Sequence, residues 1–179
     1  TKDNKAIMIS GPTPGVGKSF VAKLLGIFLA QRDKKVLVMD CDFKRGKLHE
    51  FFNLSKLDFS QYFNHSENCK KVNDNLYFYP RPARKGRESL NVLESEKFSN
   101  LVKDLKGKFD YIIFDTPPAL AVSDSLAMTR YVDLNILTIR QGFSANRDVE
   151  RTLEDFENLE KPVGYFIFND FNKPSGYYG

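Results

Sequence analysis

The stretch IMISGPTPGVGKSF, residues 7–20, decides the fold of this chain. It joins an apolar run typical of a buried strand to a loop rich in glycine and proline, which ends in Gly17-Lys18-Ser19 ahead of an amphipathic helix. In phosphate-binding loops, backbone N–H groups at the helix N-terminus hold phosphate, the lysine reaches the β- and γ-phosphates, and the hydroxyl binds Mg²⁺. The common pattern G-x-x-x-x-G-K-[ST] has glycine at the position of Pro12. The sequence therefore predicts a nucleotide site built on a variant of this loop.

The two prolines of the loop, Pro12 and Pro14, have no N–H group and cannot donate to a phosphate. The second half of the loop must therefore supply the donors. We expect the nucleotide to be bound by Gly15, Val16, Gly17, Lys18, Ser19 and Phe20. Phe20 stands where a second hydroxyl is often found, so it offers the α-phosphate only its amide.

Composition places the chain among globular proteins. Of its 179 residues, 41% are hydrophobic and 28% are charged, which argues against disorder and favours one domain. The net charge of +4 suits phosphate-bearing ligands, and we expect no nucleic-acid partner. The apolar runs are too short to span a membrane, and no signal peptide is recognisable. Two cysteines without metal-ligand spacing favour a reducing cytosol. Because the sequence starts at Thr1 rather than Met, we expect it to be a segment of a longer chain.

Strand-like and helix-like segments alternate along the chain. Six short apolar segments are expected to be buried strands: residues 5–10, 35–40, 75–80, 110–115, 134–140 and 163–169. Apolar residues recur at helix spacing within residues 21–29, 90–105 and 149–156, whereas the polar residues 53–74 are expected to form short helices and loops. The pattern predicts an α/β fold with a doubly wound, mostly parallel sheet flanked by helices, as in P-loop NTPases. We expect residues 1–169 to form this domain and residues 170–179 a flexible C-terminal tail.

Carboxylates follow the strands at the edge where such sheets bind ligands. Asp40 and Asp42 end the strand VLVMDCD, and Asp115 ends the strand DYIIFD. A P-loop hydroxyl with one or two carboxylates commonly holds the Mg²⁺ of bound ATP, so we expect Ser19, Asp42 and Asp115 at the ion. Asp40 is then left to accept the proton of an attacking hydroxyl, which a tyrosine with a pKa near roughly 10 requires.

Four stretches resemble one known family: SGPTPGVGKSF at residues 10–20, VLVMDCDFKRGKLHEFF at 36–52, YIIFDTPPALAVSDS at 111–125 and SGYYG at 175–179. They are similar to the catalytic domain of bacterial protein-tyrosine kinases, the BY-kinases of capsule and exopolysaccharide assembly. The resemblance covers nearly the whole chain, in order and at matching spacing. The first three stretches look like the family's modified Walker A, Walker A′ and Walker B motifs, and a proline-containing loop is normal there.

The resemblance implies ATP and Mg²⁺ as cofactors, with Asp42 and Asp115 at the ion. Catalytic roles would fall to Lys18, Asp40 and Asp42, with Asp40 as the base for an incoming tyrosine. Asn169, at the end of the last expected strand, matches a position that contacts adenine in related P-loop ATPases.

The resemblance also implies the acceptors and partners. BY-kinases phosphorylate tyrosines of the C-terminal tail between neighbouring subunits, which makes Tyr177 and Tyr178 the expected phosphoacceptors. From Asn169 to Tyr178 is about nine residues, or roughly 30 Å fully extended, so the tail can reach an active site. The implied partners are ATP and ADP, neighbouring subunits and a membrane-embedded polysaccharide co-polymerase segment, at the inner face of the bacterial cytoplasmic membrane.

Two departures from the family pattern matter. The E-x-x-R-x-x-R helix that precedes the first strand and drives ring assembly is absent from this sequence, so we expect the segment to be monomeric. An N-P-x-E-L-L-like run is replaced by RPARKGRESLNVL. The basic cluster in this run is most simply a solvated loop, and the competing hypothesis is a site for an anionic partner or a neighbour's phosphotyrosine. Its members are Arg81, Arg84, Lys85 and Arg87.

Two alternative functions stay open. The first is a Min/Par-type positioning ATPase, although those proteins carry a second lysine early in the loop where this chain has Thr13. The second is a nucleotide-binding scaffold of the export machinery that transfers no phosphate.

Overall fold

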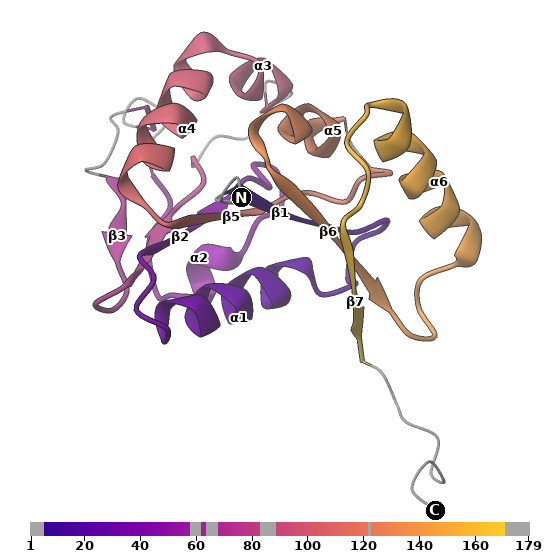
Figure 1. Ribbon diagram of the computed structural model, residues 1–179, viewed down its shortest axis with the longest axis horizontal. Helices are drawn as coiled ribbons and strands as arrows, with labels where there is room; N and C mark the ends of the chain where they lie inside the picture. Colours follow the sequence, from indigo (N-terminus) through magenta and orange to yellow (C-terminus); the bar gives the residue numbers. More distant parts are fainter. Residues whose placement is uncertain (1–5, 58–61, 64–67, 83–88, 122, 171–179) are drawn as a thin grey trace, which may run out of the picture.

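A seven-stranded sheet with helices on both faces forms the domain (Figure 1), in a computed structural model that describes residues 6–57, 62–63, 68–82, 89–121 and 123–170. The strands are β1 (Ala6–Ser10), β2 (Val36–Asp40), β3 (Lys70–Lys71), β4 (Leu76–Tyr79), β5 (Tyr111–Asp115), β6 (Leu134–Arg140) and β7 (Tyr165–Asn169). The helices are α1 (Lys18–Ala30), α2 (Leu48–Phe51), α3 (Ser89–Leu93), α4 (Glu96–Lys108), α5 (Asp124–Met128), a 3₁₀ turn (Thr129–Tyr131) and α6 (Asn146–Asn158).

The strand order is β3-β4-β2-β5-β1-β6-β7, and every neighbouring pair is parallel except β3 and β4. This confirms the expected doubly wound, mostly parallel sheet. The register pairs Asp40 of β2 with Asp115 of β5, and Ile9 of β1 with Asp115. Because the carboxyl ends of parallel strands meet at one edge, the acids and the loop after β1 come together there.

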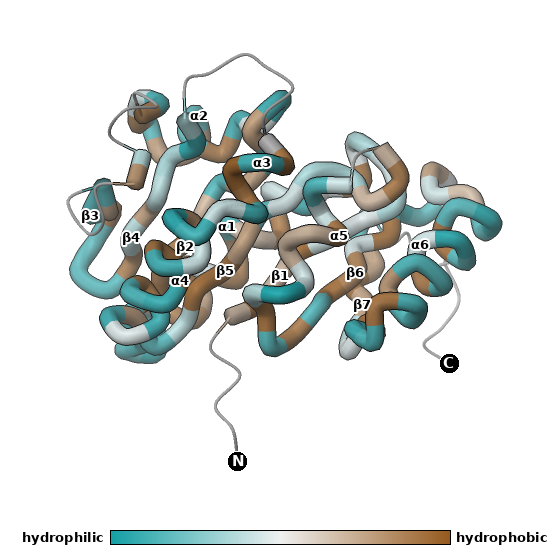
Figure 2. Tube along the Cα trace, turned by 90° about the horizontal axis from the view of Figure 1, so that it is seen from above, coloured by the Kyte–Doolittle hydropathy of each residue, from teal (hydrophilic) through white to brown (hydrophobic). Residues whose placement is uncertain are grey.

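Alternate residues of the central strands face two apolar clusters. Ile9 belongs to the cluster that includes Val21 of α1, and Met8 belongs to the cluster that includes Leu101 of α4. Figure 1 shows α1 on one face of the sheet and α3, α4 and α5 on the other. In Figure 2 the central strands are largely apolar, whereas α6 alternates hydrophilic and apolar residues. The period-two pattern of the strands thus places one core on each face.

β7 departs from the expectation of a buried strand. It lies at the edge of the sheet, and the side chains of Tyr165, Phe166 and Phe168 are 64%, 46% and 63% exposed. An apolar pattern on both faces resembles a central strand, but the pattern does not specify where in the sheet a strand lies. α1 also exposes a row of apolar side chains at helix spacing: Phe20, Leu24 and Phe28.

The helical pattern of residues 90–105 is confirmed and is divided between two helices, because Ser95 follows α3 and caps α4 by accepting a hydrogen bond from the N–H of Phe98 at 3.2 Å. The expectation for residues 53–74 was wrong in detail. Residues 53–74 contain the short strand β3, which pairs antiparallel with β4. Among the described residues, no helix is long and apolar enough to cross a membrane.

Candidate nucleotide site

The loop after β1 brings the N-terminus of α1 to the carboxyl edge of the sheet. Gly17 is the N-cap residue, with φ of 101°, a left-handed conformation that residues with a side chain rarely adopt. No side chain caps the helix, and its first turn contains no acidic residue. The first N–H groups of a helix have no partner within the helix. They are therefore available to an anion, which the helix dipole also favours.

Asn169 supports this loop from the end of β7. Its Nδ2 donates a hydrogen bond to the carbonyl of Val16 at 3.0 Å. The same amide covers Gly17 so closely that a Cβ at position 17 would be 2.2 Å from Nδ2. The amide nitrogen thus holds the phosphate loop, while contact of Asn169 with adenine stays a prediction.

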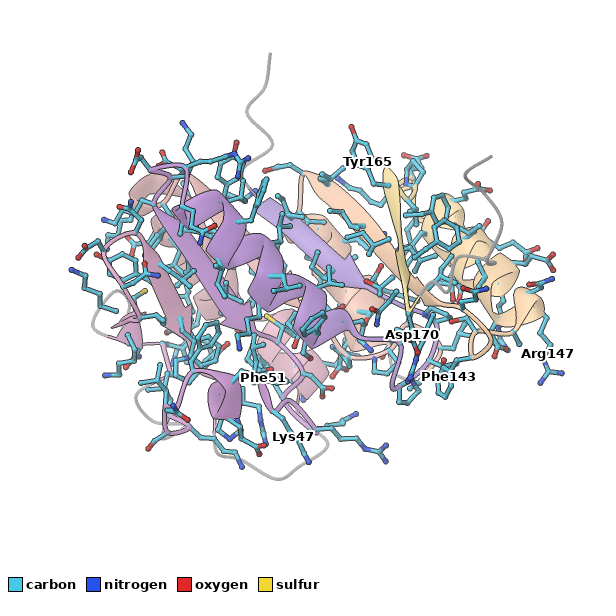
Figure 3. All side chains as sticks on the ribbon, turned by 90° about the horizontal axis from the view of Figure 1, so that it is seen from below. Lys47, Phe51, Phe143, Arg147, Tyr165 and Asp170 are labelled. Atoms are coloured by element: carbon cyan, nitrogen blue, oxygen red, sulfur yellow. The ribbon has the colours of Figure 1, made fainter. Side chains whose placement is uncertain are left out.

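Arg140, the last residue of β6, links the loop to the residue that follows β7. Its Nη1 donates to the carbonyl of Gly15 at 3.3 Å, and its Nε and Nη2 donate to Asp170 at 3.1 and 3.0 Å. Figure 3 shows Phe143 and Asp170 at this end of β7, and the Arg140 guanidinium lies 5.3 Å from the Phe143 ring centre. The start of the C-terminal tail is thereby tied to the phosphate loop.

A pocket of about 340 Å³ opens beside the loop, which is a usual size for a small-molecule site. Its lining includes Gly15, Lys18, Ser19, Asp42, Lys44 and Arg45. Asp40 and Asp115 are not in the lining, and their side chains are buried, with 0% and 1% exposed. The structure therefore places four of the expected phosphate and metal residues, Gly15, Lys18, Ser19 and Asp42, in the lining of one pocket, whereas the other two carboxylates are buried.

Burial perturbs the charged groups of the site. It lowers the pKa of Lys18, while the carboxylates of Asp115 and Asp42 act in the opposite direction. It raises the pKa of Asp115 to about 7, opposed by the Ser19 hydroxyl and the Lys18 ammonium. Burial and the nearby charge of Asp115 raise the pKa of Asp40 well above its usual range, and Arg81 opposes that rise. Two adjacent buried carboxyls ionise together only at a cost, so a nearby cation would favour their ionised forms.

The carboxylates fit a hydrated cation. Both side-chain oxygens of Asp115 and Oδ2 of Asp40 are buried and have no hydrogen-bond partner of normal geometry among the described residues. Unpaired buried acceptors are unfavourable, and an ion or its water shell would supply the missing partners. Within the described ranges, no group of three or more His, Cys, Asp or Glu side chains could hold a metal by itself. The site thus suits an ion that arrives with oxygen ligands of its own, as Mg²⁺ on a nucleotide does.

The remaining expectations have mixed outcomes. Phe20 lies in the first turn of α1 with its side chain half-exposed, and a contact of its amide with a phosphate stays a prediction. Tyr177 and Tyr178 lie outside the described residues. The expectation that the basic cluster is solvated is wrong for Arg81, which is 8% exposed and forms hydrogen bonds within the protein. The other members of the cluster, Arg84, Lys85 and Arg87, lie outside the described residues. Sequence reasoning missed Arg140, whose position at a strand end was the available signal.

Residues 7–177 match the family of CobQ/CobB/MinD/ParA nucleotide binding domains. The chain therefore belongs to this family of nucleotide-binding domains, as the loop, the acids and the sheet order indicate. Tyrosine-protein kinase ptk of Acinetobacter johnsonii is 36% identical over 183 residues, an alignment that covers 98% of this chain and 25% of that protein. The chain thus spans about a quarter of the length of such curated relatives.

Solved structures of related proteins have the same fold. The kinase domain of Escherichia coli tyrosine kinase ETK matches with a TM-score of 0.88 and 28% identity, over 97% of this chain and 70% of that chain. The septum site-determining protein MinD of Pyrococcus horikoshii matches with a TM-score of 0.75 and 22% identity, over 96% and 72%. The second likeness concerns the fold alone.

Proposed function

We propose that this domain is an ATP-dependent protein-tyrosine kinase of the P-loop type that phosphorylates Tyr177 and Tyr178 in the C-terminal tail of neighbouring copies of itself. The observation that carries the proposal is the convergence of Lys18, Ser19 and Asp42 on one pocket. The relatives named tyrosine-protein kinase, at 36% identity for the Acinetobacter protein, support this reaction over others on the same fold.

Each residue has a defined part in this proposal. Lys18 and the N–H groups of the first turn of α1 bind the phosphates, and Ser19, Asp42 and Asp115 hold the ion. When bound, Mg²⁺ would neutralise charge on the phosphates and orient them for transfer. The tyrosine oxygen bonds to the γ-phosphorus as the bond to the bridging oxygen breaks, ADP leaves, and the phenolic proton passes to Asp40. Burial raises the pKa of Asp40, and a cation bound nearby would favour the ionised form that Asp40 needs before it can accept this proton.

The setting of the reaction belongs to the same proposal. We infer that the acceptor tail reaches neighbouring subunits, that a membrane-embedded polysaccharide co-polymerase segment is the partner, and that the domain works at the inner face of the bacterial cytoplasmic membrane. The resemblance to BY-kinases of capsule and exopolysaccharide assembly supports this setting, as does a relative named as a putative tyrosine-protein kinase in a cps region.

One assay tests the activity. The domain, joined to an assembly segment so that neighbours are present, is incubated with ATP and Mg²⁺, and phosphotyrosine is mapped by mass spectrometry. We expect phosphate on Tyr177 or Tyr178 in the wild type, its loss in Lys18→Met and Asp40→Asn, and its retention in Lys34→Met, which changes an exposed lysine beyond α1. Free phosphate without labelled tyrosine would instead indicate a Min/Par-type ATPase, and neither product would indicate a non-enzymatic scaffold.

A further inference from the structure

Arg81 is a buried cation outside the pocket whose hydrogen bonds converge on one loop. It follows β4 closely in the chain and is 8% exposed. Its Nε donates to the carbonyl of Gly46 at 2.8 Å, and its Nη1 donates to the carbonyl of Phe43 at 2.7 Å. A longer bond of 3.5 Å from Nη1 reaches the carbonyl of Pro82. The two short bonds hold the loop between β2 and α2, which carries Asp42.

The loop that Arg81 holds folds back on the acids. The N–H of Gly46 donates to the carbonyl of Asp42 at 2.8 Å, and the N–H of Arg45 donates to Oδ1 of Asp42 at 2.9 Å. The N–H of Asp42 in turn donates to Oδ1 of Asp40 at 3.2 Å. The orientation of the Asp42 carboxylate therefore depends on the turn that Arg81 fixes.

Gly46 also shows how tightly the turn is placed. A Cβ at this position would be 2.2 and 2.6 Å from the two carboxylate oxygens of Asp40 and 2.6 Å from the carbonyl of Asp42. The backbone of Gly46 therefore packs directly against Asp40. Because Arg81 bonds the carbonyl of this same glycine, it maintains the close packing of the turn on the acid.

We propose that Arg81 is a positioning residue that aligns Asp42 for the metal ion. The inference rests on the proposed site for Mg²⁺ and a nucleotide, not on tyrosine transfer itself. A guanidinium presents donors in a rigid fork that can bond two carbonyls at once, whereas a lysine ammonium is a single flexible point charge. Loss of Arg81 should therefore weaken the contribution of Mg²⁺ to nucleotide affinity. It should leave unchanged the contribution of Lys18 and of the helix N-terminus.

The test measures ADP affinity by calorimetry, first in EDTA and then with saturating Mg²⁺, for the wild type, Arg81→Gln and Arg81→Lys. We expect Arg81→Gln to bind ADP in EDTA within about twofold of the wild type and to lose about tenfold of the Mg²⁺-dependent gain. Arg81→Lys, which keeps the charge and one donor direction, should recover part of that gain. Arg147→Gln is the matched control, because Arg147 projects from α6 into solvent (Figure 3) with 90% of its side chain exposed.

Thermal unfolding of each variant without ligand shows that it is folded before its affinity is compared. If Mg²⁺ increases the ADP affinity of Arg81→Gln as much as that of the wild type, the proposal is overturned. It is also overturned if Arg81→Gln loses the same factor of ADP affinity in EDTA and in Mg²⁺, because that result indicates general damage to the site. If Arg81→Gln does not fold, a full gain in folded Arg81→Lys overturns it. A wild type whose ADP affinity ignores Mg²⁺ would overturn it too, whereas failure to label tyrosine with the Mg²⁺ effect intact would contradict only the kinase proposal.

Discussion

Asp115 is a buried carboxyl that should lower the free energy of unfolding of the ligand-free domain when it is ionised. Its pKa is raised to about 7 by burial, from an ordinary value of 3.8. A carboxyl with a raised pKa in the folded state destabilises the fold as pH rises above the unfolded value, and the effect is complete above the folded value. Each pKa unit corresponds to about 1.4 kcal/mol. The ligand-free domain should therefore lose stability between about pH 4 and pH 7.

Asp115→Asn should relieve that loss. We expect the ligand-free variant to unfold several degrees above the wild type at pH 8 and at the same temperature as the wild type near pH 4, measured by circular dichroism. Glu157→Gln, which changes an exposed carboxylate of α6, serves as the control and should show no such pH-dependent difference. An Asn variant that is less stable than the wild type at pH 8 would contradict the assigned direction. The gain in stability should accompany loss of Mg²⁺-dependent nucleotide binding.

Asn169 has one bond that the structure shows and one contact that the sequence predicts. Its amide nitrogen donates to the carbonyl of Val16, so Asn169→Ala should loosen the phosphate loop and lower the affinity for every nucleotide. If its amide oxygen also binds the adenine base, ADP should suffer an additional loss. We expect a fall of about threefold for GDP and about tenfold for ADP, within the range of one or two lost hydrogen bonds. Equal losses in a calorimetric comparison would leave Asn169 with the loop-holding role alone.

At the scale of the elements, Gly26 lets α1 approach the sheet. A Cβ there would be 2.5 Å from Val38, closer than atoms of a packed core can lie, and 3.3 Å from Leu76, which is a tight contact. Gly107, near the end of α4, has no atom within 4 Å of the position that a Cβ would take. The two glycines differ in their surroundings although both are helical.

Gly26→Ala and Gly107→Ala should therefore change stability in opposite directions. Alanine favours a helix over glycine by up to about 1 kcal/mol, which Gly107→Ala should gain in part near its helix end. Gly26→Ala should instead lower the free energy of unfolding by about 1–2 kcal/mol, because overpacking exceeds that gain. Urea denaturation of both variants checks the pair. A stabilised Gly26→Ala would mean that α1 can shift away from the sheet.

The sequence predicted which segments form strands better than it predicted where each strand lies in the sheet. Each parallel strand was predicted to within two residues at each end, because short apolar runs between helix-like segments identify strands. The exposure of β7 was not predictable, since Phe166 and Phe168 match the pattern of a central strand. β3 was missed because Lys70 and Lys71 carry no strand signal and depend on pairing with β4.

The candidate site shows the same division. That Lys18, Ser19 and Asp42 line one pocket could be predicted, because spacing along the chain and the positions of strand ends bring them to the same edge of the sheet. Arg81 could not, because a basic run looks solvated until the fold brings the carbonyls of Phe43 and Gly46 to its guanidinium. Contacts between residues so far apart in the chain depend on the completed sheet, which no local pattern encodes.

At the scale of the whole molecule, stability should respond to ligands jointly. Because the described carboxylates form no metal group of their own, Mg²⁺ alone should leave the unfolding temperature nearly unchanged. ADP alone should raise the unfolding temperature, and ADP with Mg²⁺ should raise it most. A hundredfold excess of ligand over Kd adds about 2.7 kcal/mol to the free energy of unfolding. Differential scanning fluorimetry in buffers free of other divalent ions checks this order. A large effect of Mg²⁺ without nucleotide would point to a metal site outside the described ranges.

The tie between Arg140 and Asp170 has a kinetic consequence. Under the proposed kinase function, an acceptor anchored at Asp170 is a tethered reactant, since about seven residues lead from it to Tyr177 and limit the tether to roughly 25 Å. Short tethers give effective concentrations in the millimolar range. A free tyrosine peptide would have to approach such concentrations before it could compete with the tail of an assembled neighbour for a phosphoryl group, so modification between subunits should dominate until the tyrosines of the tails are used.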